Sequence, residues 1–335
     1  MIYALDNLRA LAVISVFILH FCHTYKCNFP FFGQNGGWFG IQIFFILSGF
    51  LIIRSKSKRN IKEYLTARVL RIFPVYIIIT LFVIFLHEHE YNFLSIHALA
   101  NLFMLQHIFP VSLVRGDVLH VTWTLTIELL WYGIAPIFLI LLKKTPHKTL
   151  LITILVSGFF VYYSKYGVFD FIYQKHFEIL GISKLEGNRD FFITNSFIAQ
   201  LPFFVLGGYL FFKRDSLSKI STKLLAVVSL SLMTFSCLVV NSHFFPNILT
   251  GISIVSFFII ALKHLNYKIK ILSLIANISY SFYLIHFPVI IYVKYNLKIE
   301  NILLGLGCCT LIAITFSIFF FYFIERKFMN LYSKK

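Results

Sequence analysis

Long, uninterrupted apolar segments are the feature that most constrains how this chain folds. A helix of about 17 to 25 apolar residues crosses the ~30 Å hydrocarbon core of a bilayer. The chain divides into about ten segments near this length, which we place at residues 5–25, 37–53, 72–86, 123–142, 150–165, 192–212, 224–240, 248–262, 271–293 and 302–324. They are continuously apolar, whereas the strands of a membrane barrel alternate apolar and polar residues. The sequence therefore predicts an all-α fold, a polytopic integral membrane protein with about ten transmembrane helices.

The composition excludes a soluble protein. Of the 335 residues, 59% are hydrophobic and 13% are charged, and the mean hydropathy is +0.83. Ordinary globular proteins carry about 25% charged residues. One weaker apolar piece, residues 94–109, is interrupted by His97, Asn101, Gln106 and His107, and we interpret it as an interfacial or re-entrant helix.

The net charge of +17, from 30 basic and 13 acidic residues, could by itself indicate a nucleic-acid partner. Its distribution over alternate loops indicates topology instead. One set of loops, together with the C-terminal tail, carries 21 Lys and Arg against three acidic residues, whereas the opposite set carries eight of each. The positive-inside rule then predicts that both termini are cytoplasmic, and we expect no nucleic-acid partner.

The sequence predicts one transmembrane domain over residues 1–335. No cleavable signal is evident, because the first apolar segment begins close to Met1, contains Arg9 and is not followed by a small-residue cleavage site. No spacing of cysteines, histidines or carboxylates predicts a metal site. Cys22 and Cys27 allow an outer-face disulfide, although we favour free cysteines packed as small apolar residues.

The first apolar segment contains the ionisable residues Asp6, Arg9 and His20, and charge is costly there and therefore marks a candidate site. Arg9 and His20 are eleven residues apart, about three helical turns plus ~20°, so both project from one face about 16 Å apart. Asp6 lies at the position i−3 that allows it to pair with Arg9. The alternative is an arginine that extends to the cytoplasmic interface and a histidine hydrogen-bonded to a neighbouring helix.

The second segment and the loop after it carry the next candidates. GGWFGIQIFFILSGFLI contains several glycines and Ser48, which favour close helix packing. The loop ends in RVLRIFP, where Arg68 and Arg71 share one helical side just before the third segment and Pro74 falls in its first turn. Two guanidinium groups so placed suit a phosphate-bearing ligand from the cytoplasm, although topology alone also places arginines there.

Two more ionisable residues fall in later apolar segments. Glu128 lies in WTLTIELLWY and needs a partner, for which His20 at similar depth is one possibility. Glu128 or a backbone group would then orient the imidazole and set its tautomer. His286 lies in ISYSFYLIHFP, and we interpret it as a packed polar residue with a catalytic role as the alternative. At the cytoplasmic end of the last segment, Glu325 and Arg326 are expected to form an ion pair.

Together these segments resemble the acyltransferase 3 family, the bacterial membrane O-acyltransferases that modify surface polysaccharides. Five weak motifs occur in family order over almost the whole chain, namely LDNLRALAVISVFILH, GGWFGIQIFFILSGFLI, RVLRIFP, WTLTIE, and ISYSFYLIHFP followed by FIERKF. The resemblance implies that Arg9, His20, Arg68, Arg71 and Glu128 match positions tied to activity.

The resemblance also implies a reaction. An acyl group, usually acetyl, passes from cytoplasmic acyl-CoA to a sugar hydroxyl at the outer face of the bacterial cytoplasmic (inner) membrane, with acetyl-CoA as a substrate and no bound cofactor. The chain ends soon after the last segment, so we expect the standalone form without an appended extracytoplasmic domain. That form favours O-antigen, capsule or exopolysaccharide, free or lipid-linked, over peptidoglycan as acceptor.

In the expected mechanism, Arg68 and Arg71 hold the phosphates of CoA with Arg9 behind them, and His20 takes the proton of the acceptor hydroxyl. Direct transfer and an acyl-enzyme on His20 or Ser48 are both open. The competing functional class is a transporter or flippase for a glycan or solute. Such proteins commonly have repeat symmetry between their halves, which the sequence lacks.

Overall fold

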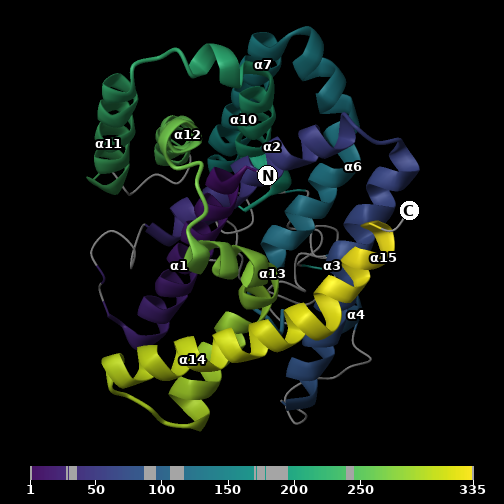
Figure 1. Ribbon diagram of the computed structural model, residues 1–335, viewed down its shortest axis with the longest axis vertical. Helices are drawn as coiled ribbons and strands as arrows, with labels where there is room; N and C mark the ends of the chain where they lie inside the picture. Colours follow the sequence, from purple (N-terminus) through teal and green to yellow (C-terminus); the bar gives the residue numbers. More distant parts are fainter. Residues whose placement is uncertain are drawn as a thin grey trace.

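The computed structural model describes residues 2–27, 29, 36–86, 96–105, 117–169, 171, 178, 195–238 and 245–333, and its regular elements there are all helical (Figure 1). The first half comprises α1 (Tyr3–Tyr25), α2 (Gly36–Lys56), α3 (Ile61–Leu86), the short α4 (Ile96–Leu102), α6 (Thr122–Lys144) and α7 (Pro146–Lys165). The second half comprises α10 (Phe197–Leu217), α11 (Thr222–Leu238), α12 (Phe245–His264), α13 (Lys270–Ile291), α14 (Ile302–Phe320) and α15 (Arg326–Ser333), with single π-helical turns, η1 and η2, at Tyr292–Asn296 and Phe321–Glu325.

The all-α class is confirmed over the described residues, and each of the ten predicted apolar segments overlaps a helix. Six helical stretches are long and apolar enough to cross a membrane: Tyr3–Tyr25, Trp38–Lys56, Ile61–Leu86, Thr122–Lys144, Lys270–Asn296 and Ile302–Leu331. Two shorter apolar helices cover Thr222–Ser236 and Ile248–His264. The chain is therefore a multi-pass membrane protein, while the count of ten spans and the side of each terminus stay predictions.

The centre of the molecule is formed by α2, which packs against α1, α6 and α10. Glycines allow the closest of these contacts. A methyl group added at Gly49 would overlap the backbone of Phe204 on α10, and one added at Gly207 would overlap the backbone oxygen of Ile46 on α2. The packing role expected for the glycine-rich second segment is confirmed at Gly49, because no larger residue fits where these two backbones meet.

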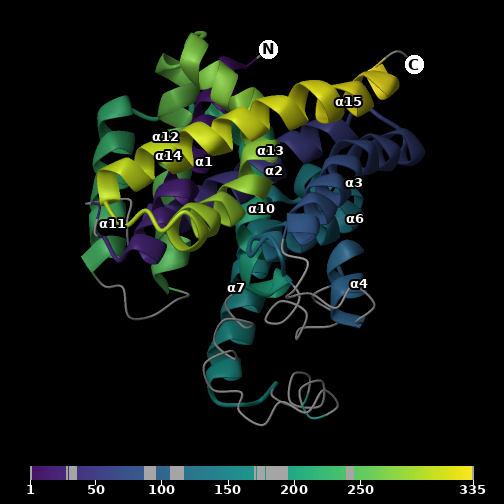
Figure 2. The ribbon, with the colours of Figure 1, turned by 90° about the horizontal axis from the view of Figure 1, so that it is seen from below.

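Helix ends that the sequence assigns to the same side of the membrane lie together. Near the start of α1, Asn7 Nδ2 donates to the backbone oxygens of Leu265 (3.0 Å) and Tyr267 (3.3 Å) in the α12–α13 connection. At the other end of α1, the Tyr25 hydroxyl donates to the backbone oxygen of Ile299 before α14, 3.0 Å away. Figure 2 shows the start of α1 and the end of α15 on one side of the molecule.

Helix α3 begins earlier than predicted, because a cap precedes it. The Glu63 amide donates to Asn60 Oδ1 (2.8 Å), which starts the helix in the stretch interpreted as a loop. Arg68 and Arg71 consequently lie inside a continuous helix, and Pro74 stands in its interior instead of its first turn.

The weak segment at 94–109 is helical over α4, whereas residues 94, 95 and 106–109 lie outside the described residues. Asn101 at the end of α4 is buried, and its Oδ1 accepts a hydrogen bond from the Thr122 hydroxyl at the start of α6 (3.2 Å). Asp117 accepts from the backbone amides of Leu119 (3.2 Å) and Thr122 (3.0 Å), and burial raises the pKa of its carboxyl. These hydrogen bonds fix the residues that lead into α6, and the first residue of α6, inside the protein.

The expected ion pair between Glu325 and Arg326 was wrong. Glu325, at the end of the second π-helical turn, is buried and accepts from the Ser281 hydroxyl of α13 at 2.8 Å. Arg326 instead lies over the ring of Tyr322, 5.7 Å from its centroid. Neighbours in a helix project about 100° apart, so one side chain faces the core and the next the surface.

Candidate active site

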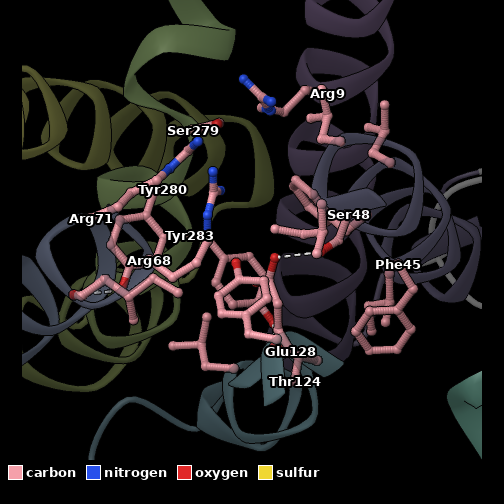
Figure 3. A pocket seen from close by; sticks show the side chains of 18 residues that line it. Arg9, Phe45, Ser48, Arg68, Arg71, Thr124, Glu128, Ser279, Tyr280 and Tyr283 are labelled. Atoms are coloured by element: carbon pink, nitrogen blue, oxygen red, sulfur yellow. Dashed lines mark hydrogen bonds between the residues drawn. The ribbon is translucent and has the colours of Figure 1, made fainter. Parts of the chain in front are cut away.

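A pocket lies among α1, α2, α3, α6 and α13 (Figure 3). We call it the arginine pocket, because the guanidinium-bearing residues Arg9, Arg68 and Arg71 line it. Ser48 and Glu128 line it as well. Five of the residues singled out in the sequence, from four separate motifs, therefore meet in one cavity.

Arg9 and Arg68 are held by different contacts. Arg9 pairs with Asp6 as the i, i+3 spacing predicted, although the closest atoms are 3.7 Å apart. Arg68 donates from Nη2 to Ser55 Oγ (3.1 Å) and lies 5.9 Å from the centroid of the Tyr132 ring. Its buried Nε has no hydrogen-bond partner among the described residues. The pocket therefore contains guanidinium groups whose hydrogen-bonding capacity is only partly used.

Glu128 is the carboxylate among these cations. Ser48 Oγ on α2 donates to Glu128 Oε1 on α6 at 2.8 Å, the contact drawn as a dashed line in Figure 3. A serine hydroxyl that donates to a carboxylate has the arrangement of a nucleophile beside a base. The pocket thus combines three cationic side chains with a hydroxyl that donates to a carboxylate.

The expected contact between Glu128 and His20 was wrong. Glu128 faces the arginine pocket, whereas His20 Nδ1 lies 2.9 Å from His286 Nε2 on α13. We call His20 and His286 the histidine pair. The two candidates do not meet because Glu128 is turned toward Ser48 on α2, whereas His20 is turned toward His286 on α13.

The histidine pair adjoins the pocket along α13. Tyr283 lines the pocket and hydrogen-bonds to Thr124 through the two hydroxyls, 2.6 Å apart. His286 follows one turn later, and its Nδ1 lies 2.8 Å from the Tyr283 backbone oxygen. One turn of α13 therefore separates the polar lining of the pocket from the paired imidazoles.

Sequence reasoning missed several residues of this site. Thr124, Tyr132 and Tyr283 line the pocket, and the ring of His120 lies 5.2 Å from that of Phe287, which also contacts His20. Thr124 lies one helical turn before Glu128, so the i, i+4 spacing was an available signal. His120 had no such signal, because it precedes α6 with a left-handed backbone (φ 57°).

The described residues contain no cluster of three or more histidines, cysteines or carboxylates able to hold a metal ion. Cys22 and Cys27, one candidate pair for a disulfide, are free thiols with sulfur atoms 3.1 Å apart.

Comparison with known proteins assigns most of the chain to one family model. A model described as "Acyltransferase domain" matches residues 2–323. The chain is 32% identical over 174 residues to "Peptidoglycan O-acetyltransferase OatA" of Listeria monocytogenes, covering 46% of this chain and 27% of that protein. It is 31% identical over 175 residues to "Putative peptidoglycan O-acetyltransferase YrhL" of Bacillus subtilis, covering 45% and 26%.

An uncharacterized protein of Haemophilus influenzae is 29% identical over 236 residues, covering 62% of this chain and 91% of that protein. The chain thus spans about a quarter of the length of the two relatives that have a named activity. No solved structure matches the chain.

Proposed function

This chain belongs to the acyltransferase 3 family, and from that premise we propose that it transfers an acetyl group from cytoplasmic acetyl-CoA to a hydroxyl of a cell-surface polysaccharide. Family membership and the names of two relatives support a membrane O-acyltransferase in general. The donor, the acceptor, the inner-membrane location and the residue roles are our proposal.

The arginine pocket is the observation that carries the choice of donor. Three guanidinium groups face one carboxylate there, so the lining is net cationic. CoA is a large polyanion, and guanidinium groups bind phosphate through paired, charge-assisted hydrogen bonds. We propose that Arg68 and Arg71 hold its phosphates, with Arg9 behind them, and that the pantetheine arm extends along α1 and α13 toward the histidine pair.

The proposed base is His20, which takes the proton of the acceptor hydroxyl as the hydroxyl oxygen attacks the thioester carbonyl. The carbon–oxygen bond forms, the carbon–sulfur bond breaks, and the leaving thiolate of CoA receives the proton. Glu128 has a different proposed role from the one first expected, because it accepts from Ser48. That pair supports the competing route, in which the acetyl group rests on Ser48 before the sugar receives it.

The proposed acceptor is a surface glycan, either O-antigen, capsule or exopolysaccharide, free or lipid-linked. The printed names of two relatives support a glycan hydroxyl as acceptor, and for those proteins the polymer is peptidoglycan. Peptidoglycan is therefore the fraction against which the other glycans should be compared.

The proposal is tested by mass spectrometry of separated glycan fractions from cells with and without the gene. We expect the gene to add acetyl mass to one polysaccharide fraction and Arg71→Ala to reduce that addition at equal protein abundance. Arg214→Ala is the matched control, because Arg214 lies at the end of α10, 46% exposed and paired with Asp215. Loss of a whole glycan, with no acetyl difference, would support transport and overturn the proposal.

The route is tested by labelling with radioactive acetyl-CoA in the absence of acceptor. Under direct transfer, no label accumulates on the chain, and Ser48→Ala retains transfer. Under the acyl-enzyme route, label accumulates on wild-type protein and is lost in Ser48→Ala. Glu128→Gln replaces the carboxylate beside Ser48 by a neutral amide and should therefore reduce labelling under the acyl-enzyme route.

A further inference from the structure

His286 is the part of this site for which neither the family resemblance nor the pocket supplies a role. It is fully buried on α13, and the rings of Phe17 and Phe282 pack against it, with centroids 6.4 and 6.0 Å away. A buried imidazole must have both ring nitrogens hydrogen-bonded to offset the loss of water. The partners of those nitrogens determine which of them carries the hydrogen.

Backbone oxygens determine the tautomer of His286. Its Nδ1 lies 2.8 Å from the oxygen of Tyr283 and 3.2 Å from that of Phe282. A carbonyl oxygen only accepts, so Nδ1 must carry the hydrogen. In a neutral imidazole the other nitrogen, Nε2, is then an acceptor.

The tautomer of His286 in turn determines that of His20. His20 Nδ1 lies 2.9 Å from His286 Nε2, so the His20 nitrogen must donate. The two ring planes differ by 1° and their centroids are 5.1 Å apart, so the rings meet edge to edge and the hydrogen bond lies in both planes. With its hydrogen on Nδ1, neutral His20 has its lone pair on Nε2.

Exposure distinguishes the two rings. His286 is inaccessible, whereas His20 is partly exposed, so only His20 can reach an acceptor hydroxyl. Phe287 lies against His20 edge to face (4.7 Å, 69°), with His120 on the same ring. These contacts restrict rotation of the His20 ring, which keeps Nδ1 directed at His286.

We propose that His286 is a positioning residue that holds His20 in the Nδ1–H tautomer, so that His20 Nε2 takes the proton of the acceptor hydroxyl. The inference rests on the proposed function, because it assumes that His20 is the base. After proton transfer, His20 is the imidazolium and still donates from Nδ1 to His286. His286 stays neutral, with its own hydrogen on Nδ1, which donates to the backbone oxygens of Tyr283 and Phe282. The thiolate of CoA then receives the proton from His20 Nε2.

Two substitutions of similar volume separate positioning from packing. His286→Gln keeps an oxygen able to accept from His20 Nδ1, whereas His286→Met fills the space without a comparable acceptor. We expect His286→Met to lower kcat by about 100-fold or more, the scale of general-base catalysis, with KM for acetyl-CoA nearly unchanged. His286→Gln should recover kcat to within about tenfold of wild type, because the tautomer is retained.

Three further measurements complete the test. His20→Ala combined with His286→Met should be no slower than His20→Ala alone, since the second residue acts through the first. His147→Met is the control, because His147 at the start of α7 hydrogen-bonds to Tyr209 on α10 and neither residue lines the arginine pocket. Nitrogen-15 solid-state NMR of labelled histidine should report the Nδ1–H tautomer of His20 in wild type and a mixture in His286→Met.

Equal loss in His286→Gln and His286→Met, at equal abundance, would overturn the inference, and so would an unchanged tautomer in His286→Met. If wild-type protein does not transfer acetyl from acetyl-CoA, the proposed function fails instead. The NMR measurement still decides the tautomer in that case, so the two failures are distinguishable.

Discussion

The arginine pocket and the histidine pair share helices α1 and α13, yet they hold their polar groups in different ways. In the pocket, Arg9 meets Asp6 only at 3.7 Å, with side chains 19% and 26% exposed, and Arg68 keeps an unbonded Nε. In the pair, His286 is fully buried and both of its ring nitrogens are bonded. The difference fits the division of labour that we propose, with the arginines binding a charged ligand and the fixed imidazole transferring a proton.

The largest expected effect separates catalysis from binding. His20→Ala should lower kcat by about 100- to 10,000-fold, because it removes the proposed base. Equilibrium binding of acetyl-CoA should change little, since His20 does not line the arginine pocket. Single-turnover transfer of labelled acetyl and a separate binding measurement check this. A comparable loss of binding would mean that the two regions do not divide these tasks.

A substitution in the arginine pocket should have the opposite effect, raising KM and leaving kcat nearly unchanged. Arg71→Ala should raise KM for acetyl-CoA by about 10- to 100-fold, the value of a charge-assisted hydrogen bond of about 1.5–3 kcal/mol. The effect of Arg71→Ala on kcat, measured at saturating acetyl-CoA, should be much smaller. Titration of initial rates against acetyl-CoA measures both parameters, with Arg214→Ala as the control outside the pocket. An unchanged KM would remove Arg71 from the donor site.

A substitution at the contact between α2 and α10 should lower the stability of the fold. Gly207→Ala should destabilise the fold by about 1–3 kcal/mol, because the added methyl group overlaps the Ile46 backbone oxygen and α2 must shift. Gly133→Ala on α6 is the control, since nothing lies within 4 Å of its added methyl group. Unfolding in detergent, followed by a tertiary-structure signal, compares them. Equal stability would mean that α2 and α10 separate without cost.

The smallest expected effect comes from a substitution that changes neither the arginine pocket nor the histidine pair. Tyr25→Phe removes the hydrogen bond to the Ile299 oxygen (3.0 Å) between two helix ends. We expect a loss of about 0.5–1.5 kcal/mol in stability, with kcat and KM unchanged. The same unfolding and rate measurements apply. A fall in kcat would instead indicate that this end of α1 sets the position of His20.

The helical elements were predictable because each depends on the hydropathy and length of one continuous segment of the chain. An apolar run long enough to cross a bilayer is visible without any partner, and every predicted segment overlaps a helix. The start of α3 was placed too late, because hydropathy alone does not detect the Asn60 cap. The i, i+3 contact of Asp6 and Arg9 was predictable for the same reason, since one helix fixes its geometry.

The contacts between helices were not predictable in this way. Glu128 was expected to meet His20, because both appeared to lie at similar depth, but depth along an axis does not define which way a helix is turned. The interpretation of His286 as a packed polar residue is confirmed by its burial, but its partner His20, 266 residues away, was not predicted. Glu325 was paired with its neighbour Arg326, although burial directs it to Ser281 instead.

The amino-acid sequence by itself determined that this protein lies in a lipid bilayer. It also determined the approximate positions of the helices and the small set of ionisable residues within them. These follow from hydropathy, helical periodicity and the cost of charge in hydrocarbon. Only the tertiary structure decided that Ser48 meets Glu128 and that His20 meets His286, across 80 and 266 residues. Such pairings depend on how helices rotate and approach one another, and glycine contacts such as Gly49 against Phe204 set that approach.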